Sequence, residues 1–122
     1  MNKLLCLDTY ALVEISKANS SYENILDENF VIPNPVIAEF YNILLREYNE
    51  RTANYWLKLL KPYRGKIRLD VWIKAIKFKN KHKKEKLSFF DCIGYIFALE
   101  NNMTFVTGDK QFSNKSQVLY IK

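Results

Sequence analysis

Two aspartates occupy positions where a carboxylate could bind a ligand. Asp8 follows the apolar run 4–7, and Asp109 follows the apolar run 104–107 and Gly108. If both runs are parallel strands, their carboxyl ends lie where open α/β sheets bind ligands. Each aspartate also has a structural alternative, because Asp8 could cap a following helix and a Gly-Asp pair is common in turns. Metal binding or hydrolysis is therefore one reading of both positions.

A third acid, Asp91, is the only charged residue of segment 89–99, which is apolar nearly all round and therefore predicts a buried helix. An ionised carboxylate there is costly unless it is paired, bound to metal or close to an opening. Ser88 could cap this helix together with Asp91, which explains the acid only in part. Gly94 and Ala98 follow at i+3 and i+7, so we expect room for a ligand beside the carboxylate.

The fourth acid, Glu39, belongs to the second turn of a predicted helix that Asn34 caps and Pro35 begins. A salt bridge to Arg46 or a solvated position is its alternative role. In a parallel sheet all four acids map to the same edge, where they would repel one another unless a hard cation such as Mg²⁺ or Mn²⁺ compensated them. The predicted metal ligands are Asp8, Glu39, Asp91 and Asp109.

Alternating strand and helix patterns would position these acids. Strand character is present at residues 4–7, 30–32, 67–69, 104–107 and 118–121. Helical patterns separate most of these runs, including residues 51–60, after which Pro62 and Gly65 indicate a break, and a basic stretch at 71–83. This order predicts one α/β domain over residues 1–122, with a mostly parallel sheet of about five strands covered by helices.

The length and composition agree with one domain, since 122 residues with 48% hydrophobic side chains suffice for a single core. The net charge of +6 is compatible with a polyanionic partner, although a chain rich in Lys and Asn could reach it without selection for binding. Five lysines precede the Asp91 helix and could follow a nucleic-acid backbone, or form a solvated helix face. They are Lys77, Lys79, Lys81, Lys83 and Lys84.

Other classes of protein find little support. The first residues resemble neither a signal peptide nor a membrane span, so we expect a soluble cytoplasmic protein. Cys6 and Cys92 are isolated within apolar stretches, which predicts reduced core residues rather than a zinc site or a disulfide. With three glycines there is no phosphate-binding loop, hence no nucleotide cofactor, and the single His82 offers no catalytic triad.

Four segments, taken in order and spacing, resemble PIN-domain nucleases, and more narrowly the toxins of VapBC toxin–antitoxin pairs. They are residues 7–9, 35–40, 87–93 and 105–112. The resemblance covers essentially the whole chain and implies a three-layer α/β/α sandwich. It further implies an endoribonuclease that uses Mg²⁺ or Mn²⁺ and leaves a 5′-phosphate and a 3′-hydroxyl.

The resemblance also implies roles for particular residues. Asp8, Glu39, Asp91 and Asp109 match the acidic positions of the family, and Thr107 matches a hydroxyl residue often found before the last acid. We expect Asp8 and Asp91 to be the primary metal ligands, with Glu39 and Asp109 completing the site through water or with a second ion. An antitoxin partner and a homodimer are the implied assemblies.

Several other functions stay open. A PIN-like module could bind RNA or protein without cutting, and a PIN nuclease could process RNA without being a toxin. Phosphotransfer receivers and aspartate-nucleophile phosphatases also place acids at strand ends. They fit badly, because receivers need a pair of acids near the first strand and these phosphatases need a second Asp two residues after the first, where this chain has Tyr10.

Overall fold

The computed structural model describes residues 4–122, and its centre is a five-stranded sheet in the order β3-β2-β1-β4-β5. Every strand pair described is parallel. The carboxyl ends of the strands therefore share one edge, as the sequence predicted. The strands are β1 (Leu5–Leu7), β2 (Phe30–Pro33), β3 (Arg64–Gly65), β4 (Thr104–Thr107) and β5 (Val118–Tyr120).

The third strand is not where the sequence placed it. The prediction of a strand at 67–69 is wrong, because Arg64 and Gly65 pair with β2 and Leu69 already begins a helix. Gly65 lies so close to its neighbours that an added Cβ would be 2.7 Å from Cγ1 of Val31. In this strand glycine permits close packing, whereas in the sequence it resembled a break between elements.

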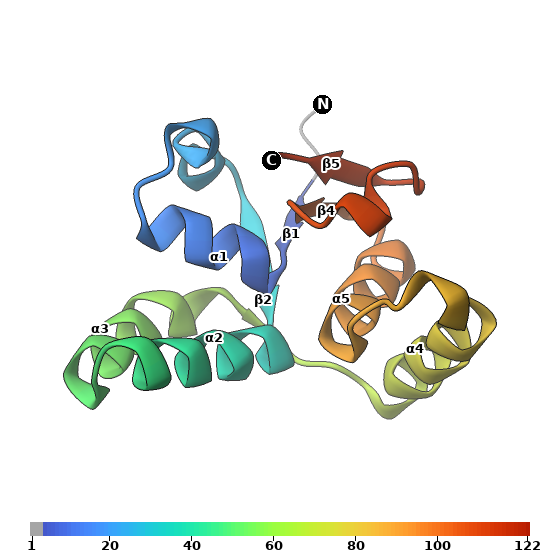
Figure 1. The fold of residues 1–122 in the computed structure, drawn as a ribbon, viewed down its shortest axis with the longest axis horizontal. Coiled ribbons are helices and arrows are strands. Elements are labelled where there is room, and N and C mark those ends of the chain that lie inside the picture. The colour runs from blue at the N-terminus through green and yellow to red at the C-terminus, as the bar shows by residue number, and fades with distance from the viewer. Residues whose placement is uncertain (1–3) are drawn as a thin grey trace.

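Five α-helices and five short 3₁₀ turns connect the described strands (Figure 1). The α-helices are α1 (Thr9–Ser16), α2 (Asn34–Glu47), α3 (Glu50–Leu60), α4 (Leu69–Lys81) and α5 (Phe89–Glu100). The 3₁₀ turns are η1 (Ser20–Tyr22), η2 (Ile25–Asp27), η3 (Lys61–Tyr63), η4 (Lys83–Glu85) and η5 (Lys110–Phe112). The helices predicted at 51–60 and 71–83 are confirmed, with α4 shifted by two residues.

Two hydrophobic clusters, one on each face of the sheet, confirm the three-layer architecture. Leu5 and Leu7 pack with side chains of α1, α2 and α3, whereas Cys6 packs with those of α4 and α5. This alternation is the two-residue period of a strand that is covered on both faces. Cys6 and Cys92 are buried and free, as predicted. Within residues 4–122, no helix has the length and apolar character needed to cross a bilayer.

The helix starts agree in part with the sequence. Ser88 caps α5, because its Oγ accepts the backbone N–H of Asp91 at 3.2 Å. Asn34 does not cap α2 as predicted. It is the first residue of the helix, Pro33 precedes it, and no side chain caps this end. Because Pro33 and Pro35 both lack an N–H, fewer donors at this helix end need a cap.

Candidate active site

Asp8 connects β1 to α1 and is completely buried. Its Oδ1 accepts the backbone N–H of Ala11 at 2.8 Å, so the N-cap reading of the sequence is correct. Its Oδ2 is buried without a hydrogen-bond partner among the described residues. Buried polar atoms are rarely left unpaired. Capping therefore explains one oxygen of this carboxylate and leaves the other available to a ligand.

Asp91 lies in the first turn of α5 and its side chain is half-buried at the wall of a groove. The predicted room beside it, at Gly94 and Ala98, does not exist. An added Cβ on Gly94 would lie 3.0 Å from Cε1 of Phe105, and Ala98 is completely buried in the core. These small residues let α5 approach the sheet closely, and the open space beside Asp91 is a groove that neither Gly94 nor Ala98 lines.

Glu39 in α2 is oriented by α1. Thr9 donates a hydrogen bond from its hydroxyl to Oε1 of Glu39. The alternative partner, Arg46, instead lies 3.9 Å from Glu47. Glu39 is half-buried and lines the same groove as Asp91. Its position is therefore set by a contact between two helices that both begin at the carboxyl edge of the sheet (Figure 1).

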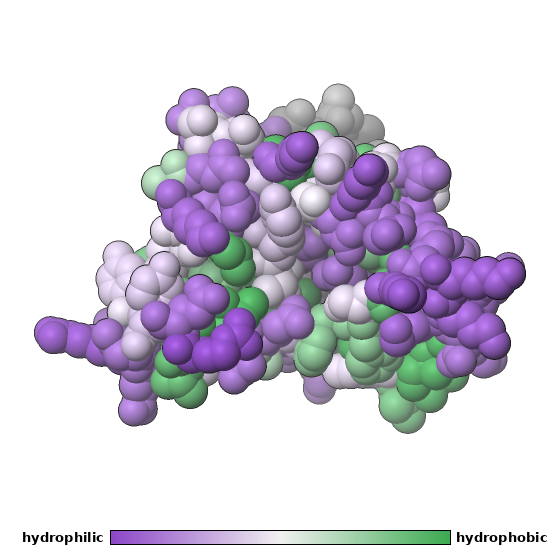
Figure 2. All heavy atoms as spheres, viewed as in Figure 1, coloured by the Kyte–Doolittle hydropathy of each residue, from purple (hydrophilic) through white to green (hydrophobic). Residues whose placement is uncertain are grey.

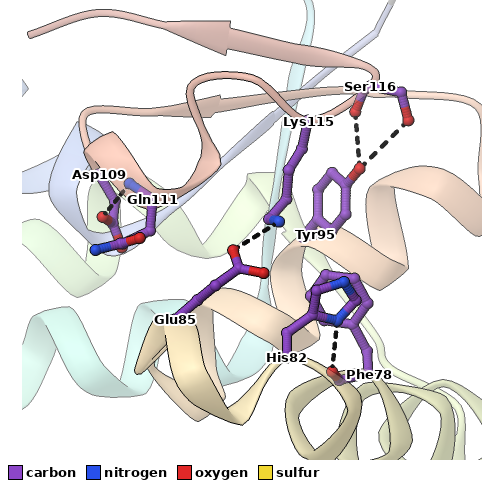
Figure 3. Close-up of polar contacts among 8 residues, drawn as sticks. All are labelled: Phe78, His82, Glu85, Tyr95, Asp109, Gln111, Lys115 and Ser116. Carbon is purple, nitrogen blue, oxygen red and sulfur yellow. Dashed lines mark hydrogen bonds and ion pairs between the residues drawn. The ribbon is translucent and has the colours of Figure 1, made fainter.

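Asp109 follows β4 and caps the short turn η5. Its Oδ1 accepts the backbone N–H of Gln111 at 2.9 Å (Figure 3). Its own N–H donates to Oγ1 of Thr107 at 3.0 Å. Thr107 is completely buried, so its hydroxyl fixes the backbone of Asp109 from below the surface. The turn reading of Gly108-Asp109 is thus correct, and the second carboxylate oxygen is not used by that turn.

The segment that carries Asp109 is attached to the helical layer beneath it (Figure 3). Lys115 binds Glu85 of η4 with an Nζ–Oε1 distance of 2.9 Å, and its Nζ lies 5.7 Å from the ring centroid of Phe78. Tyr95 of α5 donates from its hydroxyl to the carbonyl of Ser116 at 3.0 Å. These contacts hold the loop between β4 and β5 against α4, η4 and α5, the last of which carries Asp91.

One groove of about 640 Å³ brings these acids together. Glu39, Asp91 and Asp109 line it, and Asp8 is buried close enough for its charge to act on Asp91. The other lining residues are Thr9, Tyr10, Val13, Glu14, Lys17, Ile43, Ser88, Gly108 and Lys110. The structure thus places three of the predicted acids on one groove at the carboxyl edge of the sheet, with the fourth, Asp8, buried within range of their charges.

Burial and mutual repulsion raise the pKa of two of these carboxyl groups. The pKa of Asp8 rises to about 7, first through burial and then through the charges of Asp109 and Glu39, while the nearby Thr107 side chain and the backbone N–H of Ala11 oppose the rise. The pKa of Asp91 rises to about 8, again through burial first and then through the other three acids. At neutral pH these sites favour a proton, or another cation in its place.

The residues fit a divalent cation in chemical type. All four offer carboxylate oxygens, which Mg²⁺ and Mn²⁺ prefer, and Oδ2 of Asp8 is buried and unpaired among the described residues. Across residues 4–122, no three His, Cys, Asp or Glu side chains are near enough to one another to form a complete metal cage. Ion binding would require the side chains to move closer, since like charges at this spacing repel.

The predicted lysine run lies outside this groove. None of Lys77, Lys79, Lys81, Lys83 and Lys84 lines it. The run gives a strongly hydrophilic surface at the end of α4 and at η4 (Figure 2). Lys79 donates from Nζ to the carbonyl of Leu87 at 2.5 Å, which occupies it in the packing of the α4–α5 connection. RNA binding by these lysines stays a prediction.

Other groove residues were missed by the sequence reasoning. Tyr10 and Lys17 line it from α1 and the residue after that helix, and Lys110 lines it from η5. The spacing 10, 13, 14 and 17 places one face of α1 along the groove. That spacing was readable in the sequence, but only the fold reveals which helix face meets the acids.

Comparison with known proteins agrees with this architecture. VapC20 of Mycobacterium tuberculosis, described as a toxin that cleaves the sarcin–ricin loop, has a TM-score of 0.77 at 16% identity, covering 92% of this chain and 95% of that one. A toxin–antitoxin complex from Klebsiella pneumoniae gives a TM-score of 0.74 at 16% identity, with 94% and 95% covered. VapBC2 from Rickettsia felis, bound to a promoter DNA fragment, gives 0.73 at 17% identity, with 97% of each chain covered.

At these identities the solved structures establish the fold alone. A comparison with curated proteins gives no significant match. The family comparison is more direct, because the PIN domain model matches residues 5–117, nearly the whole chain. With its parallel sheet and its four acids at the carboxyl edge, this chain belongs to the PIN domain family.

Proposed function

We propose that this protein is a metal-dependent endoribonuclease and acts in the cytoplasm as the toxin of a toxin–antitoxin pair. The observation that carries the proposal is that Glu39, Asp91 and Asp109 line one groove, while Asp8 is buried within range of their charges and has Oδ2 unpaired among the described residues. Membership of the PIN family and the likeness to VapC20, a sarcin–ricin loop-cleaving toxin by its description, support it.

The chain's own residues have separable roles in this reaction. Asp8 and Asp91 are the primary ligands for Mg²⁺ or Mn²⁺, since their raised pKa values indicate carboxylates in need of a cation. Glu39, fixed by Thr9, accepts a proton or a water hydrogen bond in the groove. Asp109, fixed through Thr107, lines the same groove and can accept a further water hydrogen bond.

When bound, a divalent cation would supply positive charge that makes water a better nucleophile and neutralises the phosphoryl oxygens. Water attacks phosphorus and gives up a proton, the bond from phosphorus to the 3′-oxygen breaks, and the 3′-oxygen takes up a proton, so that the products are a 5′-phosphate and a 3′-hydroxyl. The carboxylates do not carry the leaving group covalently. Their work is to hold and orient, which agrees with phosphoryl transfer as chiefly a matter of positioning and electrostatics.

The test is cleavage of end-labelled single-stranded RNA with Mg²⁺, with Mn²⁺ and with EDTA. We expect Asp91→Asn to lower the metal-dependent rate by more than about 100-fold, because even changes to outer-shell partners of metal sites cost about 10- to 100-fold. Asp70→Asn is the matched control, since Asp70 is exposed in α4 and pairs with Arg68. Cleavage that survives EDTA or Asp91→Asn would refute the proposal, and metal-independent RNA binding without cleavage would favour a binding module.

The toxin role and its partners need separate tests. We expect growth arrest on expression that Asp8→Asn relieves, whereas a PIN nuclease for RNA processing would not arrest growth.

The apolar groove of about 380 Å³ between α2 and α3 offers an antitoxin a docking surface, with Ile37, Tyr41 and Leu57 inside and Lys61 and Arg64 at its rim. The basic rim suits an acidic amphipathic segment. A homodimer is part of the proposal and is checked by sedimentation.

A further inference from the structure

Tyr10 is an aromatic side chain placed between the carboxylates of the groove. It lies in the first turn of α1, two residues after Asp8, and lines the groove together with Asp91 and Asp109. The residue is 38% exposed, so a substantial part of it is open to a ligand. Neither metal binding nor the positioning of the four acids requires an aromatic residue here.

Gly108 provides the seat for this ring. An added Cβ on Gly108 would lie 2.0 Å from Cε1 and 2.3 Å from Cδ1 of Tyr10, so the ring packs directly on the glycine backbone. The backbone conformation does not explain the glycine, because none of the described glycines has a positive φ. Contact with Tyr10 does explain it. The ring is therefore held in place before any ligand arrives.

Basic side chains flank the ring along the same groove. Lys110 comes directly after Asp109, and Lys17 lies two turns beyond Tyr10 along α1. A nucleic-acid strand that follows this groove would place phosphates near the lysines and one base over the aromatic ring. Aromatic residues beside basic ones are typical of single-strand binding, where each base offers a face for stacking.

We propose that Tyr10 is a stacking platform for one unpaired base beside the phosphate that is cut. This inference rests on the proposed ribonuclease function and deepens it, because it names the side chain on which a base of the substrate would stack. A paired base is stacked within its own helix and cannot lie on the ring, so the platform selects loops, bulges and ends.

The test is binding of short fluorescent single-stranded RNAs in EDTA, measured by anisotropy. We expect Tyr10→Phe to bind within about twofold of the wild type and Tyr10→Leu to bind roughly 5- to 100-fold more weakly, since stacking contributes about 1–3 kcal/mol per base. Tyr48→Leu is the matched control, because Tyr48 is 58% exposed at the end of α2 and does not line the groove.

An abasic scan separates stacking from a structural role. In a series of RNAs, each RNA lacks the base at one position. We expect that at one position the missing base weakens binding to the wild type. With Tyr10→Leu, the RNA that lacks this base should bind as tightly as the intact RNA. Gly108→Ala, which displaces the ring while keeping the tyrosine, should also remove that position-specific effect. Equal affinity of Tyr10→Leu and wild type, or the same abasic profile for both, would overturn the inference.

The outcomes distinguish this inference from the proposed function. RNA that is bound with a Tyr10-dependent abasic position, yet never cut with Mg²⁺ or Mn²⁺, would refute the nuclease and keep only the stacking of a base on Tyr10. If the RNA is cut in a metal-dependent way, but each missing base affects the binding of wild type and Tyr10→Leu equally, the nuclease function stands and the stacking role of Tyr10 is refuted. Cleavage of fully duplex RNA as fast as single-stranded RNA would also refute the platform.

Discussion

The hydroxyl of Thr9 donates a hydrogen bond to Glu39 and so joins the first residue of α1 to the second turn of α2. Thr9 follows Asp8 directly, so one short junction after β1 orients two of the four acids. Asp8 is buried at this junction, and the side chain of Thr9 holds Glu39 at the groove. The local sequence Asp-Thr thus sets both a buried and a partly exposed member of the site.

Thr9→Val should weaken this link because the isosteric side chain cannot donate. We expect the free energy of unfolding to fall by about 1 kcal/mol, the usual contribution of one hydrogen bond, and metal-dependent RNA cleavage to fall with it. Urea denaturation and cleavage rates provide the measurements. Thr9→Ser keeps the hydroxyl and is the control, so equal rates for Thr9→Val and Thr9→Ser would contradict the role assigned to the hydrogen bond.

The raised pKa values of Asp8 and Asp91 predict a pH-dependent stability in the absence of metal. Their pKa values rise from 3.8 to about 7 and about 8, so between those limits the folded state holds more protons than the unfolded state. Stability contributed by the protonated groups is present below pH 4 and is lost as the pH rises towards 8. Melting temperature measured in EDTA from pH 5 to pH 8.5 should show this decline.

Asp91→Asn tests the origin of that decline. Asparagine carries no charge, so at pH 8 without metal the variant should melt at the same or a higher temperature than the wild type, by up to several degrees for each ~1 kcal/mol of relieved repulsion. It should also lose the stabilisation that Mn²⁺ gives the wild type. Asp70→Asn should retain both behaviours. A large loss of metal-free stability in Asp91→Asn would instead assign Asp91 a structural role.

The sequence predicted those features that depend on local pattern. Apolar runs ending in Asp8 and Asp109 identified β1 and β4, and the parallel order followed from the helices between the strands. The buried helix around Asp91 was predicted from its uniform apolarity. Grouping of the acids then followed from the geometry of parallel sheets, in which strand ends and helix starts share an edge.

Features that depend on close packing between distant segments were not predicted correctly. Gly94 was read as space for a ligand, but that space is filled by Phe105 of β4, eleven residues later. Gly65 was read as a break, but it is a strand residue beneath Val31 and Phe97. A glycine in a sequence can indicate that another group approaches the backbone closely. Only the fold shows whether that group is a ligand or another part of the chain.

Alanine at these two glycines should therefore destabilise to different extents. Gly65→Ala places Cβ at 2.7 Å from Val31 and 3.1 Å from Phe97, so we expect a loss of about 1–3 kcal/mol from overpacking. Gly94→Ala meets Phe105 at 3.0 Å but gains up to about 1 kcal/mol of helix propensity, so its net loss should be smaller. Chemical denaturation gives both values, and a larger loss at Gly94 would contradict this ranking.

The salt dependence of RNA binding separates the two groups of lysines. For single strands each phosphate contact contributes a slope of about −0.7 in log affinity against log salt. Replacing both Lys17 and Lys110 with Gln should flatten the slope by roughly 1.4, because both line the groove. Replacing Lys81 and Lys84 with Gln tests the lysine run. This replacement flattens the slope only if the RNA continues past α5 to the hydrophilic end of α4. An unchanged slope for the first pair would contradict the groove as the path of the RNA, and an unchanged slope for the second would refute RNA binding by the run.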